Sequence, residues 1–342
     1  MVKALKIGSR TIGLGLPVFV IAEIGVNHEG DTNTCTQLIK SAIAAGADAV
    51  KLQTSNPDEN YVPGTKSHEI YRTCQLSLHE TEDMFSLAQS LGAEAFTTTD
   101  KSGLSWLETL NPSPVAYKVS SGLMDHIPMI QRLAATGKPL IMSTGISTIP
   151  SIQESVNMAR MSGGGGVSLL QCTSLYPTPR NLLNLASIKR LAELFECPVG
   201  LSDHSIGITA APLAVAAGAT IIEKHFTLDK HRPGFDHRIS LEASEFEQMV
   251  KAIRDAEVVM GNDQKELLPE QEDTAVSMRR CVIATKNIPA GHKFTEENLG
   301  VMRLGDCQEG LHPRYFYEIL GTFTQQSLQA YEPIPNDFID RE

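Results

Sequence analysis

The sequence predicts an α/β protein, a (β/α)8 TIM barrel followed by a small C-terminal β-rich domain. Short apolar strands recur roughly every 20–35 residues, with amphipathic helical segments between them. Gly46, Gly92, Gly137 and Gly218 lie where several of those helices would end and turn back. After Gly261 the pattern changes to a polar, acidic segment and then to a compact β-rich stretch.

Eight strands and eight helices are expected in alternation, which is the number that a barrel of this class requires. The expected strands are Val18–Glu23, Ala49–Gln53, Glu94–Thr98, Ala116–Ser121, Pro139–Ser143, Val167–Gln171, Val199–Ser202 and Thr220–His225. The expected helices are Thr32–Ala45, Glu80–Leu91, Leu104–Leu110, Ile127–Thr136, Ile149–Met161, Leu183–Phe195, Ile206–Ala217 and Ala243–Met260. A ribbon over Ala4–Ile12 turns at Gly8 and Ser9 and is expected to form a hairpin that covers one end of the barrel.

Three segments of different character are expected along the chain. Residues 1–261 are predicted to form the barrel, residues 262–278 a linker, and residues 279–342 the small domain. A domain of about 60 residues can hold only a small core. The glycine run at 163–166 is interpreted as a loop at the structural end of the barrel and not as a phosphate loop.

Composition and charge exclude several classes of function. The 342 residues are 42% hydrophobic and 20% charged, as is typical of a soluble globular protein. A net charge of −11 argues against a nucleic-acid partner and against an anionic membrane surface. The six scattered cysteines form no CxxC pair, and no secretory signal precedes them, so a cytoplasmic protein with reduced thiols is expected. No apolar run approaches the roughly 20 residues that span a bilayer.

Polar residues follow every expected strand of the barrel. Chemistry in this fold lies at the C-terminal strand ends, so these residues predict a functional pocket. In strand order they are Glu23, Asn27, His28 and Glu29; Lys51 and Gln53; Thr97–Asp100; Lys118 and Ser121; Ser143 and Thr144; Thr173, Ser174 and Tyr176; Ser202, Asp203 and His204; and Glu223, Lys224 and His225. A glycine- and proline-containing loop, Arg232–His237, then adds Asp236.

His204 and His225 end neighbouring strands and are candidate ligands of a divalent metal that polarises a carbonyl oxygen. The alternative is two unrelated histidines that cap helices or fill a polar pocket. Asp203 and Glu223 either orient the imidazoles or form ion pairs with Lys224 inside the barrel. A structural role is slightly favoured for Glu223.

Lys51 and Lys118 end two further strands and could converge at the mouth of the barrel. Together with nearby serines and threonines they would bind a phosphate or a phosphorylated carboxylate. The alternatives are a Schiff-base lysine of an aldolase and surface lysines without a role. Glu23 is a candidate general base or acceptor of a substrate hydroxyl, or simply a partner of a lysine. Tyr176 is expected to pack and to contact a hydroxyl group.

The order of these motifs resembles the sialic acid synthase family, which includes N-acetylneuraminate synthase and its legionaminate and pseudaminate relatives. The motifs are AEIGVNHEG, KLQT, YKVSSG, MSTG, CTSLYPTP, GLSDHS, EKHFT and the RPGFDH loop, and they extend over nearly the whole chain. The tail from Arg279 resembles that family's SAF domain, which is related to type III antifreeze protein. The resemblance implies a transferase that condenses phosphoenolpyruvate with an N-acylmannosamine-type sugar and water and releases phosphate.

The resemblance also implies a role for each site residue. Glu23, His204 and His225 would be catalytic, and the two histidines would bind the metal, expected to be Mn²⁺, with Mg²⁺ or Co²⁺ as alternatives. Phosphoenolpyruvate would contact Lys51, Thr98, Lys118, Ser121, Ser143, Ser174 and Ser202, and the sugar would contact Gln53, Tyr176, Asp236 and Arg303. Arg303 would reach the partner's sugar in a domain-swapped homodimer.

Four departures from the family pattern bear on the substrate. The FTTTD turn leaves open whether Thr98 or Thr99 contacts phosphate, and Leu123 stands where the family has an acidic residue. Phe235 and Leu304 each replace a proline near the expected sugar site. N-acetylneuraminate synthase is the leading hypothesis. Legionaminate or pseudaminate synthase, N-acylneuraminate-9-phosphate synthase, a synthase of the 3-deoxy-octulosonate class and a carbohydrate-binding protein are the alternatives.

Overall fold

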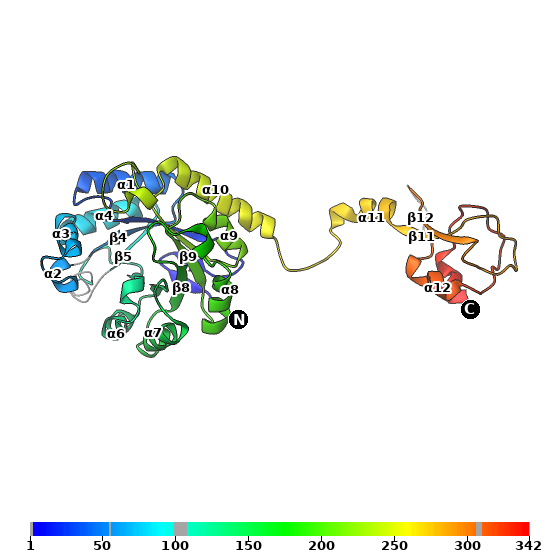
Figure 1. Ribbon diagram of the computed structural model, residues 1–342, viewed down its shortest axis with the longest axis horizontal. Coiled ribbons are helices and arrows are strands. Elements are labelled where there is room, and N and C mark those ends of the chain that lie inside the picture. The colour runs from blue at the N-terminus through cyan, green and yellow to red at the C-terminus, as the bar shows by residue number, and fades with distance from the viewer. Residues whose placement is uncertain (1–2, 55, 99–107, 306–309, 342) are drawn as a thin grey trace. The chain divides into compact units, whose positions relative to one another are not determined.

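The chain folds into two compact units, Met1–Gly261 and Asn262–Glu342 (Figure 1). The computed structural model describes residues 3–54, 56–98, 108–305 and 310–341. Each unit has its own hydrophobic core.

Eight parallel strands close into a barrel in the order β10-β3-β4-β5-β6-β7-β8-β9. Their bounds are β3 Phe19–Gly25, β4 Ala49–Gln53, β5 Glu94–Thr98, β6 Tyr117–Val119, β7 Leu140–Ser143, β8 Val167–Cys172, β9 Val199–Asp203 and β10 Ile221–His225. The predicted barrel is confirmed, and each strand boundary lies within two residues of the one expected.

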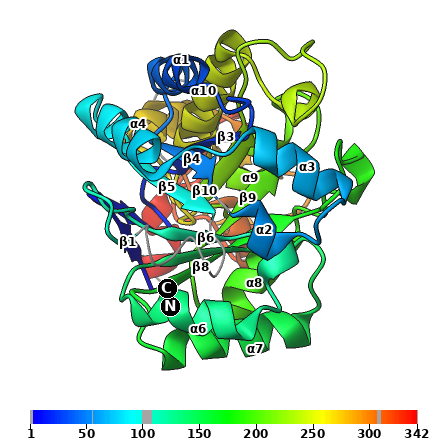
Figure 2. The same ribbon diagram turned by 90° about the vertical axis from the view of Figure 1, so that its left-hand side faces the viewer.

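Helices surround the strands, as Figure 2 shows for α1, α4, α6, α7 and α8. Their bounds are α1 Thr32–Ala44, α4 Leu78–Ser90, α6 Ile127–Ala135, α7 Ile149–Met161, α8 Ser187–Phe195, α9 Ala210–Ala216 and α10 Ala243–Met260. The helices α8 and α9 begin four residues later than expected, because Asn184 and Gly207 adopt positive φ angles of 47° and 83° that no α-helix contains. Of the expected helix Leu104–Leu110, residues 104–107 lie outside the described residues, and 108–110 are not helical.

Two short helices that the sequence did not predict follow β4. The helix α2 covers Pro57–Asn60 and α3 covers Lys66–Thr73, and they lie side by side in Figures 1 and 2. Asn56 and Thr65 cap them, because each side chain accepts a hydrogen bond from a backbone N–H of the first turn. They are only four and eight residues long and contain few apolar residues, so the long apolar repeat that predicts a helix from sequence is missing.

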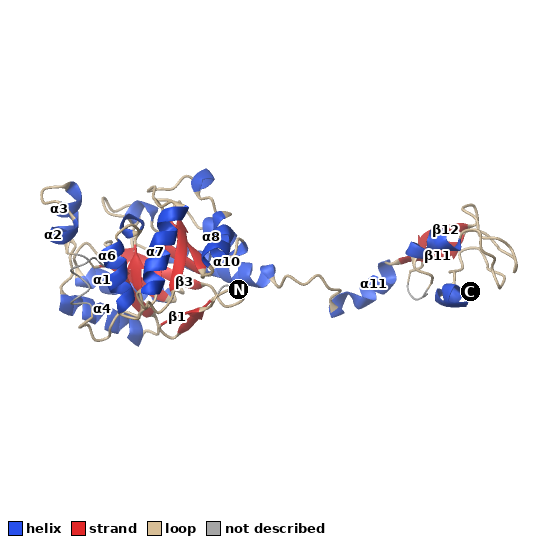
Figure 3. Cartoon of the chain, turned by 90° about the horizontal axis from the view of Figure 1, so that it is seen from below, coloured by secondary structure: helices blue, strands red, loops and turns tan. Residues whose placement is uncertain are grey.

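The opening ribbon forms an antiparallel hairpin of β1 Leu5–Ile7 and β2 Arg10–Ile12. Leu5, Ile7 and Ile12 are buried in one cluster with inward-facing residues of the barrel strands. The expectation that the hairpin covers one end of the barrel is therefore confirmed. In Figure 3, β1 lies along the edge of the barrel away from α2 and α3.

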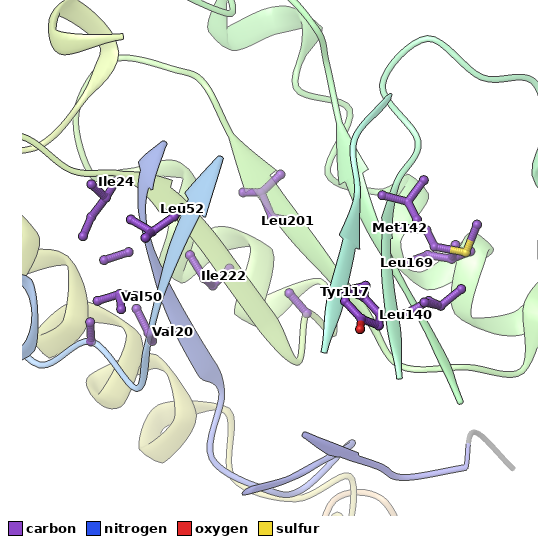
Figure 4. Close-up of a cluster of buried hydrophobic side chains, with 14 of the residues drawn as sticks. Val20, Ile24, Val50, Leu52, Tyr117, Leu140, Met142, Leu169, Leu201 and Ile222 are labelled. Atoms are coloured by element: carbon purple, nitrogen blue, oxygen red, sulfur yellow. The ribbon is translucent and has the colours of Figure 1, made fainter. Parts of the chain in front are cut away.

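Alternation along each strand separates two sets of side chains. One set faces the helices, as Figure 4 shows for residues such as Val20, Val50 and Leu201. The other fills the barrel interior with apolar residues from Phe19 in β3 to Ile221 in β10. The next inward positions after this apolar floor are polar, so the C-terminal half of the interior is available for a site.

Gly200 lets β9 and β10 approach closely. A Cβ at this position would lie 2.2 Å from the Ile221 carbonyl oxygen, and backbone cannot move aside as a flexible side chain can. We expect Gly200→Ala to lower the free energy of unfolding by about 1–3 kcal/mol, measured by urea denaturation. The control is Gly122→Ala, whose added methyl meets nothing within 4 Å. Equal stability of the two variants would contradict this reading.

The second unit contains α11 Glu272–Met278, β11 Arg280–Ala284, β12 Leu299–Arg303 and α12 Phe316–Ile319. The two strands pair in antiparallel register around a core that includes Val282, Phe294 and Leu311. The expected linker, residues 262–278, therefore ends in a helix. Across both units, no helix in the described ranges has the length and apolar character to cross a membrane.

Candidate active site

A cavity of about 480 Å³ opens at the C-terminal ends of the strands. Twelve of the predicted site residues line it: Glu23, Lys51, Gln53, Thr98, Lys118, Ser121, Ser143, Ser174, Tyr176, Ser202, His204 and His225. Asp236 lies just behind them, with Oδ2 3.6 Å from Nδ1 of His225. Arg303 lies at the exposed end of β12 in the second unit.

Two buried lysines share one carboxylate within the cavity. Nζ of Lys51 lies 3.5 Å from Glu223 Oε2, and Nζ of Lys118 lies 3.7 Å from Glu223 Oε1. Lys51 also forms an ion pair of 2.8 Å with Glu23. The lysines come from β4 and β6 and the glutamate from β10, so barrel closure alone brings them together.

Hydroxyl groups complete this cation cluster. Lys118 donates to Ser143 Oγ at 2.7 Å, and Lys51 donates to Thr98 Oγ1 at 3.2 Å. Ser202 donates to Glu223 Oε1 at 2.7 Å. Thr98 faces the cavity, whereas Thr99 lies outside the described residues. Ammonium and hydroxyl groups at this spacing suit an anion with several oxygens.

The charges in this cluster depend on one another. Burial disfavours the Glu223 carboxylate, but Lys118 and Lys51 outweigh it and lower the pKa to about 2. Burial lowers the pKa of Lys118 despite Glu223. For Lys51 the two carboxylates outweigh burial, and the pKa rises. Burial raises the pKa of Glu23, so this carboxyl is the better suited of the two to exchange a proton.

The slight preference for a structural Glu223 paired with Lys224 is wrong. Lys224 pairs instead with Asp203, at 2.7 Å, and both side chains are fully buried. Glu223 points into the barrel, where it meets Lys51 and Lys118. Side chains of successive strand residues point to opposite faces, so Glu223 and Lys224 cannot serve the same cluster. Of the two carboxylates, Asp203 and not Glu223 is therefore the ion-pair partner of Lys224. Its Oδ1 also accepts a hydrogen bond from Ser205 N.

The two imidazoles lie together at the rim, with ring centroids 5.4 Å apart. Tyr176 stacks against His204 at 4.2 Å. Nδ1 of His204 lies 3.3 Å from the Thr173 carbonyl oxygen, which can only accept, so in the neutral ring Nδ1 would carry the proton and Nε2 would be the metal-binding atom. Burial lowers the pKa of His225, which favours the neutral form that binds metals.

This pair fits a metal that takes part of its coordination from elsewhere. His225 Nδ1 is buried and has no hydrogen-bond partner among the residues that the structure describes. Among the described residues no group of three His, Cys, Asp or Glu side chains is arranged to hold a metal ion. The chain therefore offers two imidazole ligands, and water or substrate oxygens would supply the others.

Asn27 attaches the loop that carries Asp236 to the barrel. Its buried side chain accepts from Asp236 N at 3.2 Å and donates to Phe226 O at 2.9 Å and to Ser240 Oγ at 3.0 Å. This explains the asparagine of the NHEG segment, which would otherwise have no evident role at the strand end.

His28, the next residue, is buried as a neutral base. Its Nδ1 accepts a hydrogen bond from Gly30 N at 3.1 Å, and burial lowers its pKa from 6.5 to about 4. The unfolded chain binds the proton more readily, so the His28 contribution to stability is complete above pH 6.5 and lost as the pH falls to about 4.

We expect protonation of His28 to lower the free energy of unfolding by about 3 kcal/mol between pH 6.5 and pH 4. His28→Gln should show a flatter dependence in that window, measured by urea denaturation at a series of pH values. If both proteins lost stability with the same slope, another group would be responsible.

Several residues that line the cavity were not among the predicted site residues. They include Asn60, Tyr61 and Tyr71 from the α2–α3 segment, and Ile146 and Cys172 from a strand end or the turn after one. Cys172 follows the inward alternation of β8, which could have identified it. The α2–α3 residues lie in or next to two short helices after the end of β4, outside the alternation of any strand, and no comparable signal marks them.

Comparisons with known proteins show which families and solved structures the chain resembles. The NeuB family matches residues 38–265, and the SAF domain matches residues 279–340. The chain is 33% identical to the N,N'-diacetyllegionaminic acid synthase of Legionella pneumophila, over 94% of this chain and 95% of the relative. It is 32% identical to the pseudaminic acid synthase of Helicobacter pylori, over 95% and 98%. The crystal structure of an N-acetylneuraminic acid synthetase from Leptospira borgpetersenii matches with a TM-score of 0.76 and 30% identity, over 80% of this chain and 95% of that one.

Proposed function

The chain belongs to the NeuB family and carries a SAF domain, and from this premise we propose that it condenses phosphoenolpyruvate with an N-acylated mannosamine-type sugar and water, releasing phosphate. The observation that supports the proposal most is the convergence of a two-lysine anion site and a two-imidazole site on one cavity. A phosphorylated enol and an aldehyde could be held there side by side.

The residues divide between the two substrates. Lys51, Lys118 and their hydroxyl partners would hold the phosphate and carboxylate of phosphoenolpyruvate, displacing some of the contacts to Glu223. Gln53, Tyr176 and Asp236 would hold the sugar. His204 and His225 would bind a divalent metal, with Mn²⁺ expected and Mg²⁺ or Co²⁺ as alternatives, and the bound metal would polarise the aldehyde oxygen.

The proposed reaction balances without an outside oxidant or reductant. C3 of phosphoenolpyruvate forms a bond to the aldehyde carbon, and water adds to C2. The resulting tetrahedral carbon expels inorganic phosphate by cleavage of its C–O bond. Glu23, which lies between Lys51 and Gln53, is placed to exchange a proton with a sugar oxygen or with the attacking water.

N-acetylmannosamine is the leading sugar, which would make the chain an N-acetylneuraminate synthase. Lys51 and Lys118 are the only lysine or arginine residues among the described lining residues, and each already faces a carboxylate, which argues against a second phosphate on the sugar. Leu123 and Ile146 add apolar surface to the lining and favour a 2,4-diacetamido-6-deoxy sugar as the second candidate. That candidate would suit a legionaminate or pseudaminate synthase.

Phosphate release from phosphoenolpyruvate tests the proposal directly. We expect release only with a sugar and a divalent cation present, and none after treatment with EDTA. The sugars to compare are N-acetylmannosamine, its 6-phosphate and a 2,4-diacetamido-6-deoxy aldose. Release without metal, together with borohydride trapping of Lys118, would favour a Schiff-base aldolase instead. Sugar binding by calorimetry without any phosphate release would favour a carbohydrate-binding protein.

The domain-swapped homodimer and the sugar contact of Arg303 remain part of this proposal. Sedimentation velocity would report the oligomeric state of the full chain. In a swapped dimer, a mixture of His204→Ala and Arg303→Ala subunits would recover activity that neither variant has alone.

A further inference from the structure

Tyr71 contacts the proposed sugar-binding side of the cavity from the α2–α3 segment. Its hydroxyl donates to Oε1 of Gln53 at 3.1 Å. The amide Nε2 of Gln53 in turn donates to Oε1 of Glu23 at 2.8 Å. A chain of two hydrogen bonds therefore connects α3 to the carboxyl group that is expected to exchange a proton.

Both hydrogen bonds are donated in the same direction, from Tyr71 to Gln53 and from Gln53 to Glu23. A carboxylate only accepts, so Glu23 requires the amide nitrogen of Gln53 on its side. The amide oxygen must then face Tyr71, whose hydroxyl can donate to it. Burial raises the pKa of Tyr71, which keeps this hydroxyl protonated. Reversal of the amide would place two oxygens against each other at Glu23.

Glu23 is held on both of its oxygens by this arrangement. Lys51 lies 2.8 Å from Oε2, while Gln53 occupies Oε1. Gly25 permits the close approach, because a Cβ there would lie 3.0 Å from Glu23 Oε1 and 3.3 Å from Gln53 Nε2. The second N–H of Gln53 and the remaining lone pairs of Glu23 can then face a substrate in a fixed orientation.

Several contacts hold the segment that carries Tyr71. Its ring stacks on Tyr61 with centroids 5.0 Å apart and planes 16° apart. His68 of the same helix pairs with Asp58 of α2 at 2.7 Å. Gly30 packs so closely on the end of α3 that a Cβ would lie 2.6 Å from the Thr73 carbonyl oxygen.

We propose that Tyr71 is a positioning residue for the condensation: it fixes the Gln53 amide, and Gln53 fixes Glu23 opposite Lys51. The inference rests on the proposed function and assigns to the α2–α3 segment a part in sugar selection. Tyr71 acts through Gln53, so its effect falls on the sugar and not on the anion site at Lys118 and Ser143.

The test is Tyr71→Phe, which keeps the ring and its stacking and removes only the hydroxyl. We expect kcat/KM for the sugar to fall about fivefold to tenfold, as for one lost neutral hydrogen bond, while KM for phosphoenolpyruvate stays within about twofold. Tyr117→Phe is the matched control, because the Tyr117 hydroxyl is buried without a hydrogen-bond partner among the described residues. It should leave both constants unchanged.

A double-mutant cycle with Gln53→Ala identifies the route of the effect. In the Gln53→Ala background, Tyr71→Phe should cause no further loss. Unchanged kinetics of Tyr71→Phe in an active enzyme, equal losses for both substrates, or full additivity with Gln53→Ala would each overturn the inference alone. A folded wild-type protein that releases no phosphate with any of the sugars would overturn the proposed function as well. Circular dichroism and the thermal midpoint show whether each variant is folded.

Discussion

Replacement of His204 by alanine is expected to lower kcat/KM by about 10³-fold or more, with little change in the fold. The two imidazoles are the proposed metal ligands, and their ring centroids lie only 5.4 Å apart. With one ring removed, a single imidazole would have to hold the cation. Loss of several kcal/mol of carbonyl polarisation corresponds to a factor of this size, since each 1.36 kcal/mol is tenfold.

Metal binding gives a measurement that does not depend on turnover. Calorimetric titration with Mn²⁺ should show binding to the wild-type protein and a large loss of affinity in His204→Ala. His79→Ala is the control, because the His79 side chain is 84% exposed on α4 and does not line the cavity. A His204→Ala variant that binds Mn²⁺ normally, or that keeps its activity, would rule out the metal role.

Lys118→Met is expected to impair catalysis and Lys224→Met to impair stability, although both lysines are buried. Lys118 faces the cavity, and its removal should lower kcat/KM for phosphoenolpyruvate by about 10²-fold to 10³-fold, because a buried charge pair with the substrate is lost. Glu223 keeps Lys51 as a partner, so the free energy of unfolding should change little or rise.

Lys224 faces the helices, where it is the ion-pair partner of Asp203. Lys224→Met would leave a buried carboxylate uncompensated, and we expect the free energy of unfolding to fall by about 3–5 kcal/mol. The folded fraction should keep its affinity for phosphoenolpyruvate. Urea denaturation and steady-state kinetics on both variants test the pair. Destabilisation by Lys118→Met with normal kinetics would show that the assignment of the two lysines is reversed.

The sequence predicted the site well where strand alternation governs it. Lys51, Lys118, Ser143 and Ser202 all occupy inward positions of their strands, and all line the cavity. Thr98 also occupies an inward position, which places it beside Lys51. The same alternation predicts that Glu223 and Lys224 face opposite ways, and the preference for an ion pair between them did not take this period into account.

The spacing of apolar strands, the glycines at helix ends and the polar residues that follow each strand were enough to determine the barrel and its active end. These are local properties that recur along the chain, so they can be recognised without knowledge of any interatomic distance. Only the tertiary structure decided which groups are partners: Glu223 with two lysines, Asn27 with the Asp236 loop, and Tyr71 with Gln53. Those contacts join residues from different elements, and their distances are set by how the barrel closes and how α2 and α3 pack over it.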